Sequence, residues 1–427
     1  MNINMPNPWT HRINNQEISL TTKQLLNSPH FTEKEQWVLV YNTALYRQRL
    51  QYLKNSFPTN TLHTVAIKAC PLVSILKIAV EQGFGLEAAS LEEVHLAFAA
   101  DCQSNNIIFD SPVKTKDELQ FALEKGICIN ADNFDELKKI DNLISIHHQS
   151  NIGLRINPEV GEGNIKMTSV AAGASKFGVS ISAQKEQIIN SFKQYPWLNG
   201  LHIHVGSQGC NMQLLTSAAV VIDQLKQEIN DNAKNKQIKW IDIGGGLPSD
   251  YGFKAQAIDA KNYIQELNQK APGLFEQPLL TENGRSILAN CAWAISRIAY
   301  LKPHQENITA SIHFGADFMM RPVYAAKDWQ HEYLILEANG DQNTAPQVNL
   351  SIAGPLCFSG DYLTRNQALP KPSNDNFIVA KDVGAYTLST WSRHCNRRLP
   401  KVLAYSESNL EVLFEGENFE DVVSFWS

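Results

Sequence analysis

The stretch TVAIKACPLVSILKIAVEQGFGLEAAS, residues 64–90, contains the unit from which the fold can be predicted. A short apolar run at 64–69 is followed by a longer amphipathic segment at 71–83 and by a second short run at 85–90. Strands of this length that alternate with helices of ten or more residues pair in parallel through crossover connections. The stretch therefore predicts a strand–helix–strand unit of a parallel sheet.

The same alternation continues from about residue 37 to residue 290. The other short runs are WVLVY at 37–41, NIIFD at 106–110, ICINAD at 127–132, NIGLRINP at 151–158, LNGLHIHVGSQ at 198–208, KWIDIGGG at 239–246 and PLLTENG at 278–284. About eight units in this length favour a closed (β/α)8 barrel of the TIM type. An open doubly wound sheet is the alternative fold, but no GxGxxG follows the first strand.

Beyond residue 290 the pattern changes to strand-like runs separated by Gly, Pro and Asn, such as AWAISRIAYLKP and KVLAYS. These runs predict a C-terminal β-sandwich or β-barrel domain. We expect residues 37–290 to form the barrel, and residues 1–36 and 291–427 to form the β-rich domain.

Composition narrows the class of protein. The chain has 427 residues, enough for two domains, and a net charge of −6 without any block of Lys or Arg. This balance argues against a nucleic-acid or membrane partner. The N-terminus has no signal pattern, and no apolar run is long enough to span a membrane. Seven scattered cysteines without a CxxC indicate neither a disulfide framework nor a zinc site, so we expect a cytoplasmic protein.

Five features lie at expected strand ends, where the active sites of such barrels collect, or in the β-rich region. They are Lys68, the glycine triplet Gly244, Gly245 and Gly246, the ENGR turn with Glu282 and Arg285, the pair His202 and His204, and the GPLCFSGD and DVGAY segments with Cys357, Asp361 and Tyr386. Taken singly, each has a structural alternative. The lysine can extend its amine to solvent, the glycines can form a tight turn, the acid and base can be a surface ion pair, and the histidines can pack or ligate a metal.

Taken together, six motifs occur in the order of a known family. They are AIKAC, EAASLEE, HIHVGSQ, DIGGG, ENGRS and GPLCFSGD followed by DVGAY. The chain resembles the pyridoxal 5'-phosphate (PLP) decarboxylases of the alanine-racemase-like fold, which include diaminopimelate, ornithine and lysine decarboxylases. The resemblance implies fold type III and PLP as the cofactor. It also implies a homodimer with shared active sites that decarboxylates a small amino acid.

The resemblance assigns roles to residues. Lys68 matches the lysine that forms a Schiff base with PLP, and Glu282 matches the carboxylate that faces the pyridine nitrogen. His204 matches the histidine that stacks on the ring, so no metal is expected. Cys357 matches a cysteine that reprotonates the product carbon in the neighbouring subunit. The residues that match the phosphate site are Ser207, Gly244, Gly245, Gly246, Gly284, Arg285 and Tyr386, and Glu87 and Glu93 match acidic positions near the ring.

The substrate pocket departs from the family pattern. The position after Cys357, which is acidic in diaminopimelate and ornithine enzymes, is Phe358, and Arg321 and Tyr324 are one residue closer than usual. With Asp361, these are the expected substrate-binding residues. A phenylalanine cannot bond a distal ammonium, so we expect a substrate with a polar or acidic tail.

Other functions stay open at this point. Diaminopimelate itself is one expected substrate, and a conjugated diamino acid of a siderophore or secondary-metabolite pathway is the alternative. A racemase of the same fold would have Arg where this chain has Glu282. A PLP-carrier protein would lack the β-rich domain, and a sugar-phosphate barrel enzyme would leave Lys68 without a role.

Overall fold

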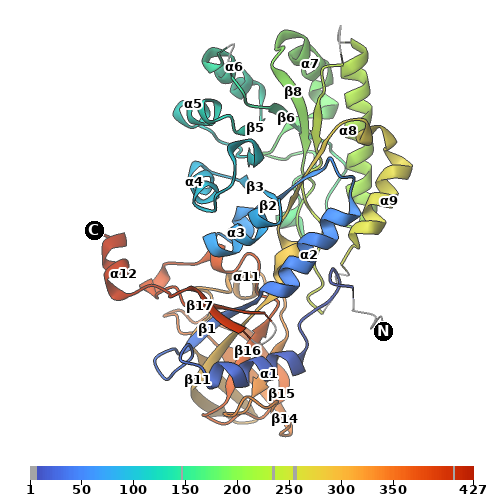
Figure 1. Ribbon diagram of the computed structural model, residues 1–427. Helices are drawn as coiled ribbons and strands as arrows, with labels where there is room; N and C mark the ends of the chain where they lie inside the picture. The colour runs from blue at the N-terminus through green and yellow to red at the C-terminus, as the bar shows by residue number, and fades with distance from the viewer. Residues whose placement is uncertain (1–6, 146–147, 233–235, 253–256, 407–408) are drawn as a thin grey trace. The chain divides into compact units, whose positions relative to one another are not determined.

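The computed structural model describes residues 7–145, 148–232, 236–252, 257–406 and 409–427. The chain divides into two compact units, drawn in Figure 1. The barrel unit consists of residues 49–249 and 255–286, and the sheet unit consists of residues 1–48, 250–254 and 287–427. Among the described residues, no helix has both the length and the apolar character needed to cross a membrane.

Eight parallel strands close the barrel in the described part of the chain. They are β2 (Leu62–Ala66), β3 (Gly85–Ala88), β4 (Ile107–Phe109), β5 (Cys128–Ala131), β6 (Ile152–Asn157), β8 (Leu198–Ile203), β9 (Trp240–Asp242) and β10 (Leu279–Asn283). Neighbours pair in the order β5-β4-β3-β2-β10-β9-β8-β6, and a further pairing between β5 and β6 closes the ring. The short strand β7 (Val179–Ser180) extends from β6. The predicted TIM-like barrel is confirmed.

Helices connect these strands and surround them (Figure 1). They are α2 (Thr43–Ser56), α3 (Val73–Glu81), α4 (Leu91–Ala99), α5 (Lys116–Lys125), α6 (Phe134–Leu143), α7 (Ile181–Gln194), α8 (Met212–Asn232), α9 (Ala260–Lys270) and α10 (Arg285–Leu288). Their ends follow local chemistry. In α5, Thr115 and Glu118 form a capping box, and Gly126 ends the helix in the left-handed conformation. The capping box fixes where α5 begins, and the left-handed glycine fixes where it ends.

The sheet unit contains a branched, mixed sheet. Its strands are β1 (Trp37–Asn42), β11 (Ala292–His304), β12 (Asn307–Ile312), β13 (Tyr333–Leu336), β14 (Gln347–Ala353), β15 (Tyr362–Pro370), β16 (Phe377–Lys381), β17 (Lys401–Ser406) and β18 (Asn409–Phe414). The path runs β15-β14-β12-β11-β1-β17-β18, and β16 pairs with β11 and β13. The pairs β1–β17 and β12–β14 are parallel and the others antiparallel. Two helices, α11 (Met320–Tyr324) and α12 (Phe419–Phe425), also belong to this unit.

One boundary in the sequence analysis was wrong. The run WVLVY was assigned to the barrel, but β1 pairs with β11 and β17 in the sheet unit. The barrel unit therefore begins at Arg49 rather than at residue 37. A central strand of either sheet is buried on both faces, so a continuous apolar run does not show whether the strand belongs to the barrel or to the mixed sheet.

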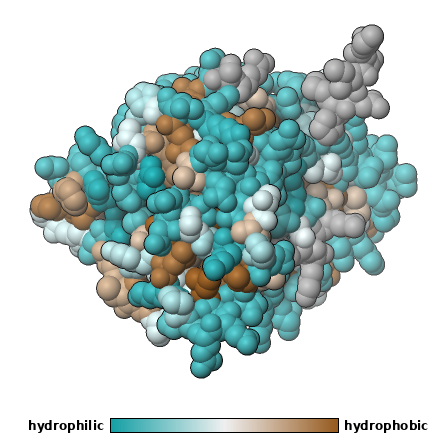
Figure 2. All heavy atoms as spheres, turned by 90° about the horizontal axis from the view of Figure 1, so that it is seen from below, coloured by the Kyte–Doolittle hydropathy of each residue, from teal (hydrophilic) through white to brown (hydrophobic). Residues whose placement is uncertain are grey.

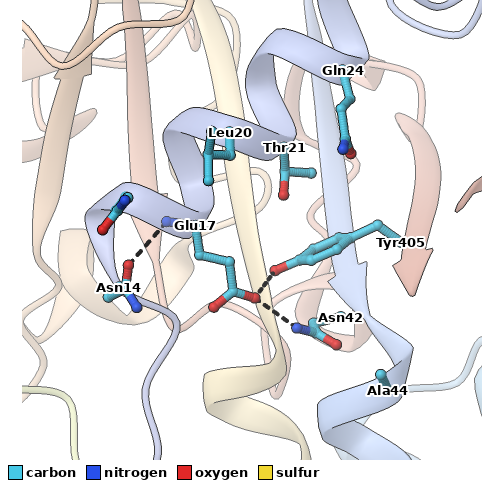
Figure 3. A pocket seen from close by; sticks show the side chains of 9 residues that line it. Asn14, Glu17, Leu20, Thr21, Gln24, Asn42, Ala44 and Tyr405 are labelled. Atoms are coloured by element: carbon cyan, nitrogen blue, oxygen red, sulfur yellow. Dashed lines mark hydrogen bonds between the residues drawn. The ribbon is translucent and has the colours of Figure 1, made fainter. Parts of the chain in front are cut away.

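Helix α1 (Asn15–Leu26) belongs to the sheet unit, and the carboxylate of Glu17 joins it to two strands of that unit by hydrogen bonds. Figure 3 draws the pocket of about 460 Å³ that it borders, in which Glu17 accepts hydrogen bonds from Tyr405 Oη at 2.8 Å and Asn42 Nδ2 at 2.7 Å. Burial would raise the pKa of Glu17, but these hydrogen bonds and His11 hold it below its usual value. The contact joins the N-terminal helix to β1 and β17.

Candidate active site

Lys68 stands at the mouth of the barrel. Strand β2 ends at Ala66, so Lys68 lies in the 3₁₀ turn Ile67–Ala69 rather than in the strand, as the run TVAIKA had suggested. Its Nζ atom is 2.6 and 2.5 Å from the two carboxylate oxygens of Glu87. Glu87 lies on β3, the strand that pairs with β2. The amine is therefore held at a defined point above the strand ends.

Glu87 is completely buried beneath this amine. Burial raises its pKa to about 8, and Glu282 and Asp110 add to the increase while Lys68 opposes it. A carboxyl group of this kind can carry a proton at neutral pH. Glu93, the last residue of the EAASLEE motif, accepts the backbone N–H of Ala89 at 2.7 Å and so caps the loop after β3.

Glu282 on β10 is the second buried carboxylate of the site. Among the described residues, neither of its oxygens has a hydrogen-bond donor in good geometry. Its carboxylate oxygens lie 3.7 Å from His202 Nε2 and 3.5 Å from His204 Nδ1. Burial opposes ionisation, yet His202 and His204 hold the pKa of Glu282 well below its usual value. A buried carboxylate with unfilled acceptor positions is the place where a ligand donor fits.

The two histidines of β8 differ in their environment. His202 is fully buried, and although burial opposes protonation, Asp110, Glu282 and Asp242 raise its pKa to about 9. His204 follows the end of the strand, and burial lowers its pKa, which favours a neutral ring. The atom Nδ1 of His204 accepts the backbone N–H of Gly245 at 3.2 Å, which fixes the ring beside the glycine triplet.

Three charged residues of this network were missed by the sequence analysis. Asp110 lies 3.0 Å from Arg155 Nη1 and 3.5 Å from His202 Nδ1, and Asp242 accepts the backbone N–H of Gly244 at 2.8 Å. Arg155 and His202 hold the pKa of Asp110 below its usual value despite burial, whereas burial and Glu282 raise that of Asp242. The strand-end rule could have identified Asp110, which ends NIIFD, but nothing in the sequence marks Arg155.

The glycine triplet forms a turn that residues with a side chain could not adopt without strain or a clash. The φ angles of Gly244 and Gly246 are +64° and +106°, a region that residues with a side chain rarely adopt. A Cβ atom on Gly245 would lie 1.9 Å from the carbonyl oxygen of Glu282. Arg285 Nε donates to Ser207 Oγ at 3.0 Å, and a Cβ on Gly246 would lie 3.0 Å from the carbonyl oxygen of Gly206, so the structure places Ser207, Arg285 and the glycine turn close together.

A loop lies against the segment that contains Ser207. The backbone N–H of Val170 donates to Val205 O at 3.0 Å, and that of Ser207 donates to Thr168 O at 3.1 Å. The loop predicted at 157–175 is thereby attached to the barrel unit beside the glycine turn.

The remaining predicted residues belong to the sheet unit. Cys357 is exposed, and the ring of Phe358 stacks on that of Tyr324 with centroids 5.8 Å apart. The guanidinium of Arg321 lies between two rings, 4.8 Å from Trp329 and 4.6 Å from Tyr386.

Asp361 has a local role that the sequence did not indicate. The carboxylate of Asp361 accepts the backbone N–H groups of Ala316 and Leu356, both at 2.7 Å, which favours a positioning role in the Cys357 loop. Substrate contact by Asp361 and phosphate contact by Tyr386, which has a φ of +57°, stay predictions.

The donor set fits PLP. Glu282 offers a buried, unfilled acceptor for a protonated ring nitrogen, Lys68 offers an amine, and the glycine turn next to Ser207 and Arg285 is of the kind that binds a phosphate. Ligand atoms of His202, His204 and Glu282, and those of Glu87, Asp110 and Glu282, lie within 4.8 Å of one another, a spacing that a metal ion could also use. A metal would leave the lysine and the glycine turn without a role, so we favour the organic cofactor.

Comparisons with known proteins agree with the assignment of PLP as the cofactor. Residues 44–289 match the family described as "Pyridoxal-dependent decarboxylase, pyridoxal binding domain". A diaminopimelate decarboxylase of Campylobacter jejuni is 27% identical over 94% of this chain and 96% of its own. A crystal structure of diaminopimelate decarboxylase has a TM-score of 0.85 at 25% identity and covers 97% of this chain and 99% of its own. That of Helicobacter pylori complexed with L-lysine has a TM-score of 0.82 at 23% identity, with coverages of 93% and 97%.

The matched region of 44–289 covers more than half of the chain and contains the lysine, the buried carboxylate and the glycine turn. The chain therefore belongs to the pyridoxal-dependent decarboxylases, carboxy-lyases that use PLP as their cofactor.

Proposed function

We propose that this enzyme removes the α-carboxyl group of a small amino acid with a polar or acidic tail, with Lys68, Glu282 and His204 at the cofactor and Cys357 as the proton donor. The single observation that carries the proposal is Glu282, an ionised and buried carboxylate with unfilled acceptor positions near Lys68. When bound, PLP supplies an electron sink for the pair left behind as carbon dioxide departs.

Lys68 and Glu87 are suited to exchange a proton. Attachment of an aldehyde cofactor needs the neutral amine at Lys68 Nζ, and release needs a proton returned to it. With its raised pKa, Glu87 can hold that proton at an oxygen 2.5–2.6 Å away. We therefore assign Lys68 to covalent attachment of the cofactor and Glu87 to control of the protonation of its amine.

Glu282 and His204 are suited to opposite tasks at the cofactor ring. Glu282 remains anionic, so it would keep a ring nitrogen protonated and increase electron withdrawal. His204 has a lowered pKa and would present a neutral, flat face. The backbone N–H of Gly246, with Ser207, Gly284 and Arg285, would hold the phosphate, while the N–H groups of Gly244 and Gly245 donate to Asp242 and His204.

Residues of the sheet unit support a preference for substrates with a polar or acidic tail. Arg321 is a cation held between Trp329 and Tyr386, and it can pair with an anionic or polar group. Phe358, stacked on Tyr324, supplies an apolar wall where an acid would be needed to hold a distal ammonium. Diaminopimelate fits this description, and so does a conjugated diamino acid with a carboxylate-bearing tail.

A substrate panel tests this preference. We expect carbon dioxide release from meso-diaminopimelate or from a citryl-conjugated diamino acid, and turnover of ornithine and lysine lower by about 100-fold or more, the cost of an unpaired buried charge. Efficient ornithine decarboxylation would contradict the proposal.

We also propose a homodimer with shared sites, in which Cys357 acts in the site of the second copy. Its exposure on a loop of the sheet unit supports this role. Mixed and refolded Lys68→Ala and Cys357→Ala subunits should regain about a quarter of the wild-type activity, because half of the dimers would contain one intact site. No recovery would indicate that each site is built from a single chain. None of the seven cysteines, all of which lie among the described residues, is in a disulfide, which favours a reducing, cytoplasmic setting.

A further inference from the structure

Two exposed thiols lie next to each other in the sheet unit. The backbone N–H of Cys357 donates to Sγ of Cys395 at 3.4 Å, although 38 residues separate the two in sequence. Because a backbone nitrogen is about 1.46 Å from its own Cα, this sulfur lies within about 5 Å of the Cα atom of Cys357. A disulfide needs an S–S distance of about 2.05 Å, so the exposed Cys357 side chain would have to rotate toward this nearby sulfur for the bond to close.

Cys395 is held in place by the contacts of its neighbours. Arg393 forms two hydrogen bonds to Glu417, and Asn396 accepts the indole N–H of Trp426 at 2.8 Å. Arg397 donates to the carbonyl of His313 at 2.9 Å. Cys395 itself has a φ of +61°, a conformation that these contacts on both sides maintain. The backbone that carries its sulfur is therefore held in place on both sides.

Cys357 lies on a short loop that is fixed at its base but not at its tip. Asp361 holds the loop through the N–H of Leu356, and the backbone N–H of Phe358 donates to Leu356 O at 2.9 Å. The ring of Phe358 also contacts that of His394 with centroids 6.1 Å apart, which links this loop directly to the Cys395 segment. The thiol of Cys357 itself remains exposed and can rotate.

The other five cysteines are poorly placed to compete. Cys70, Cys102, Cys128, Cys210 and Cys291 are all buried. Burial raises the pKa of Cys102 to about 12 and that of Cys210 to about 11, which keeps these thiols protonated and unreactive. Chemical accessibility and proximity therefore select the same pair.

We propose that Cys357 and Cys395 are a thiol modification site that closes to a reversible intramolecular disulfide under a peroxide oxidant. Its effect on activity rests on the proposed role of Cys357 as proton donor, because the disulfide consumes the S–H that this role requires. Reversible disulfides in a reducing compartment are typical of regulation rather than of structure. The enzyme would thus stop when peroxide rises and resume when thiols are restored.

The chemistry balances with hydrogen peroxide as the oxidant. One thiol loses its proton and attacks a peroxide oxygen as the thiolate, the O–O bond breaks, and a sulfenic acid and hydroxide form; the released proton converts the hydroxide to water. The second thiol attacks the sulfenic sulfur, the S–S bond forms, and a second water leaves. The two sulfurs together lose two electrons and two protons, and the peroxide is reduced to two molecules of water.

The test treats the holoenzyme with hydrogen peroxide and maps its unreduced peptides by mass spectrometry. We expect one cross-linked pair containing Cys357 and Cys395, a monomer band on a non-reducing denaturing gel, and at least a tenfold loss of carbon dioxide release that dithiothreitol reverses. Cys395→Ser should keep its basal activity and form no cross-link, and its peroxide damage should not be reversed. Separate oxidation of the two thiols without a cross-link, or equal recovery of the variant, would overturn the proposal.

The outcome is separable from that of the proposed function. If Cys357→Ala retains full activity, Cys357 is not the proton donor, and the cross-link in the wild-type protein still decides whether the modification site exists. If Cys357→Ala is inactive but peroxide produces no cross-link, the modification site alone is rejected.

Discussion

The two units present functional residues in opposite ways. At the barrel mouth, Lys68, Glu87, His202 and Glu282 form a crowded network in which burial and neighbouring charges fix each proton. In the sheet unit, Cys357 and Tyr324 are exposed, and their contacts are mainly to rings and backbone. The comparison indicates that the cofactor chemistry depends on side chains whose protonation states are fixed by burial and neighbouring charges. Substrate choice and proton delivery depend on accessible side chains, whose identity can vary.

The largest expected effect is at the lysine of the barrel unit. Lys68→Ala should lower turnover by at least about 1,000-fold, because covalent attachment of the cofactor and its return act as one unit. The measurement is carbon dioxide release, together with the visible absorption of bound PLP after gel filtration. Lys77→Ala, which removes an exposed lysine paired with Asp101, is the matched control and should change neither. A Lys68→Ala enzyme with normal turnover would refute the assignment.

Glu282→Gln comes next. It keeps the size of the side chain but removes the charge that would protonate the ring nitrogen, so kcat should fall by about 100-fold or more. Glu276→Gln, at an exposed glutamate, serves as the control. Retention of the wild-type kcat in Glu282→Gln would mean that the network fixes charge for stability rather than for catalysis.

A smaller and different effect is expected in the sheet unit. Arg321→Ala should raise KM for a substrate with an acidic tail by about 10- to 100-fold, the value of a charge-assisted hydrogen bond, with little change in kcat. Steady-state kinetics with the best substrate of the panel measure KM and kcat separately. A fall in kcat at unchanged KM would place Arg321 in the chemical step and erase the contrast between the units.

The smallest expected effect concerns pH. The folded-state pKa of Glu87 is raised from 4.5 to about 8, so the folded protein binds this proton more tightly than the unfolded chain does. Its contribution to stability is therefore complete below pH 4.5 and is lost as pH rises toward 8. Relative to Glu87→Gln, the Tm of the cofactor-free protein should fall by a few °C between pH 5 and pH 8. Parallel Tm curves for the two proteins would contradict the raised pKa.

Much of the barrel could be predicted from the sequence because each strand–helix unit carries a local signal, and because Lys68, Glu282 and the glycines lie at or just beyond the ends of recognisable strands. The sheet unit was harder to predict. β1 has the same apolar pattern as a barrel strand, and β15, YLTRNQALP, is too polar and exposed to be recognised. Arg155 and Asp242 acquire their roles only when distant strands meet inside the barrel, and the contact between Cys357 and Cys395 depends on two loops far apart in sequence.

The most direct test of the account is to locate the covalent attachment of PLP. The holoenzyme would be reduced with borohydride, digested, and searched for a pyridoxyl group on every lysine. We predict the modification on Lys68, with the other lysines, including buried Lys114 and Lys226, unmodified. A pyridoxyl group on any lysine other than Lys68 would contradict the central claim that the mouth of the barrel is the cofactor site.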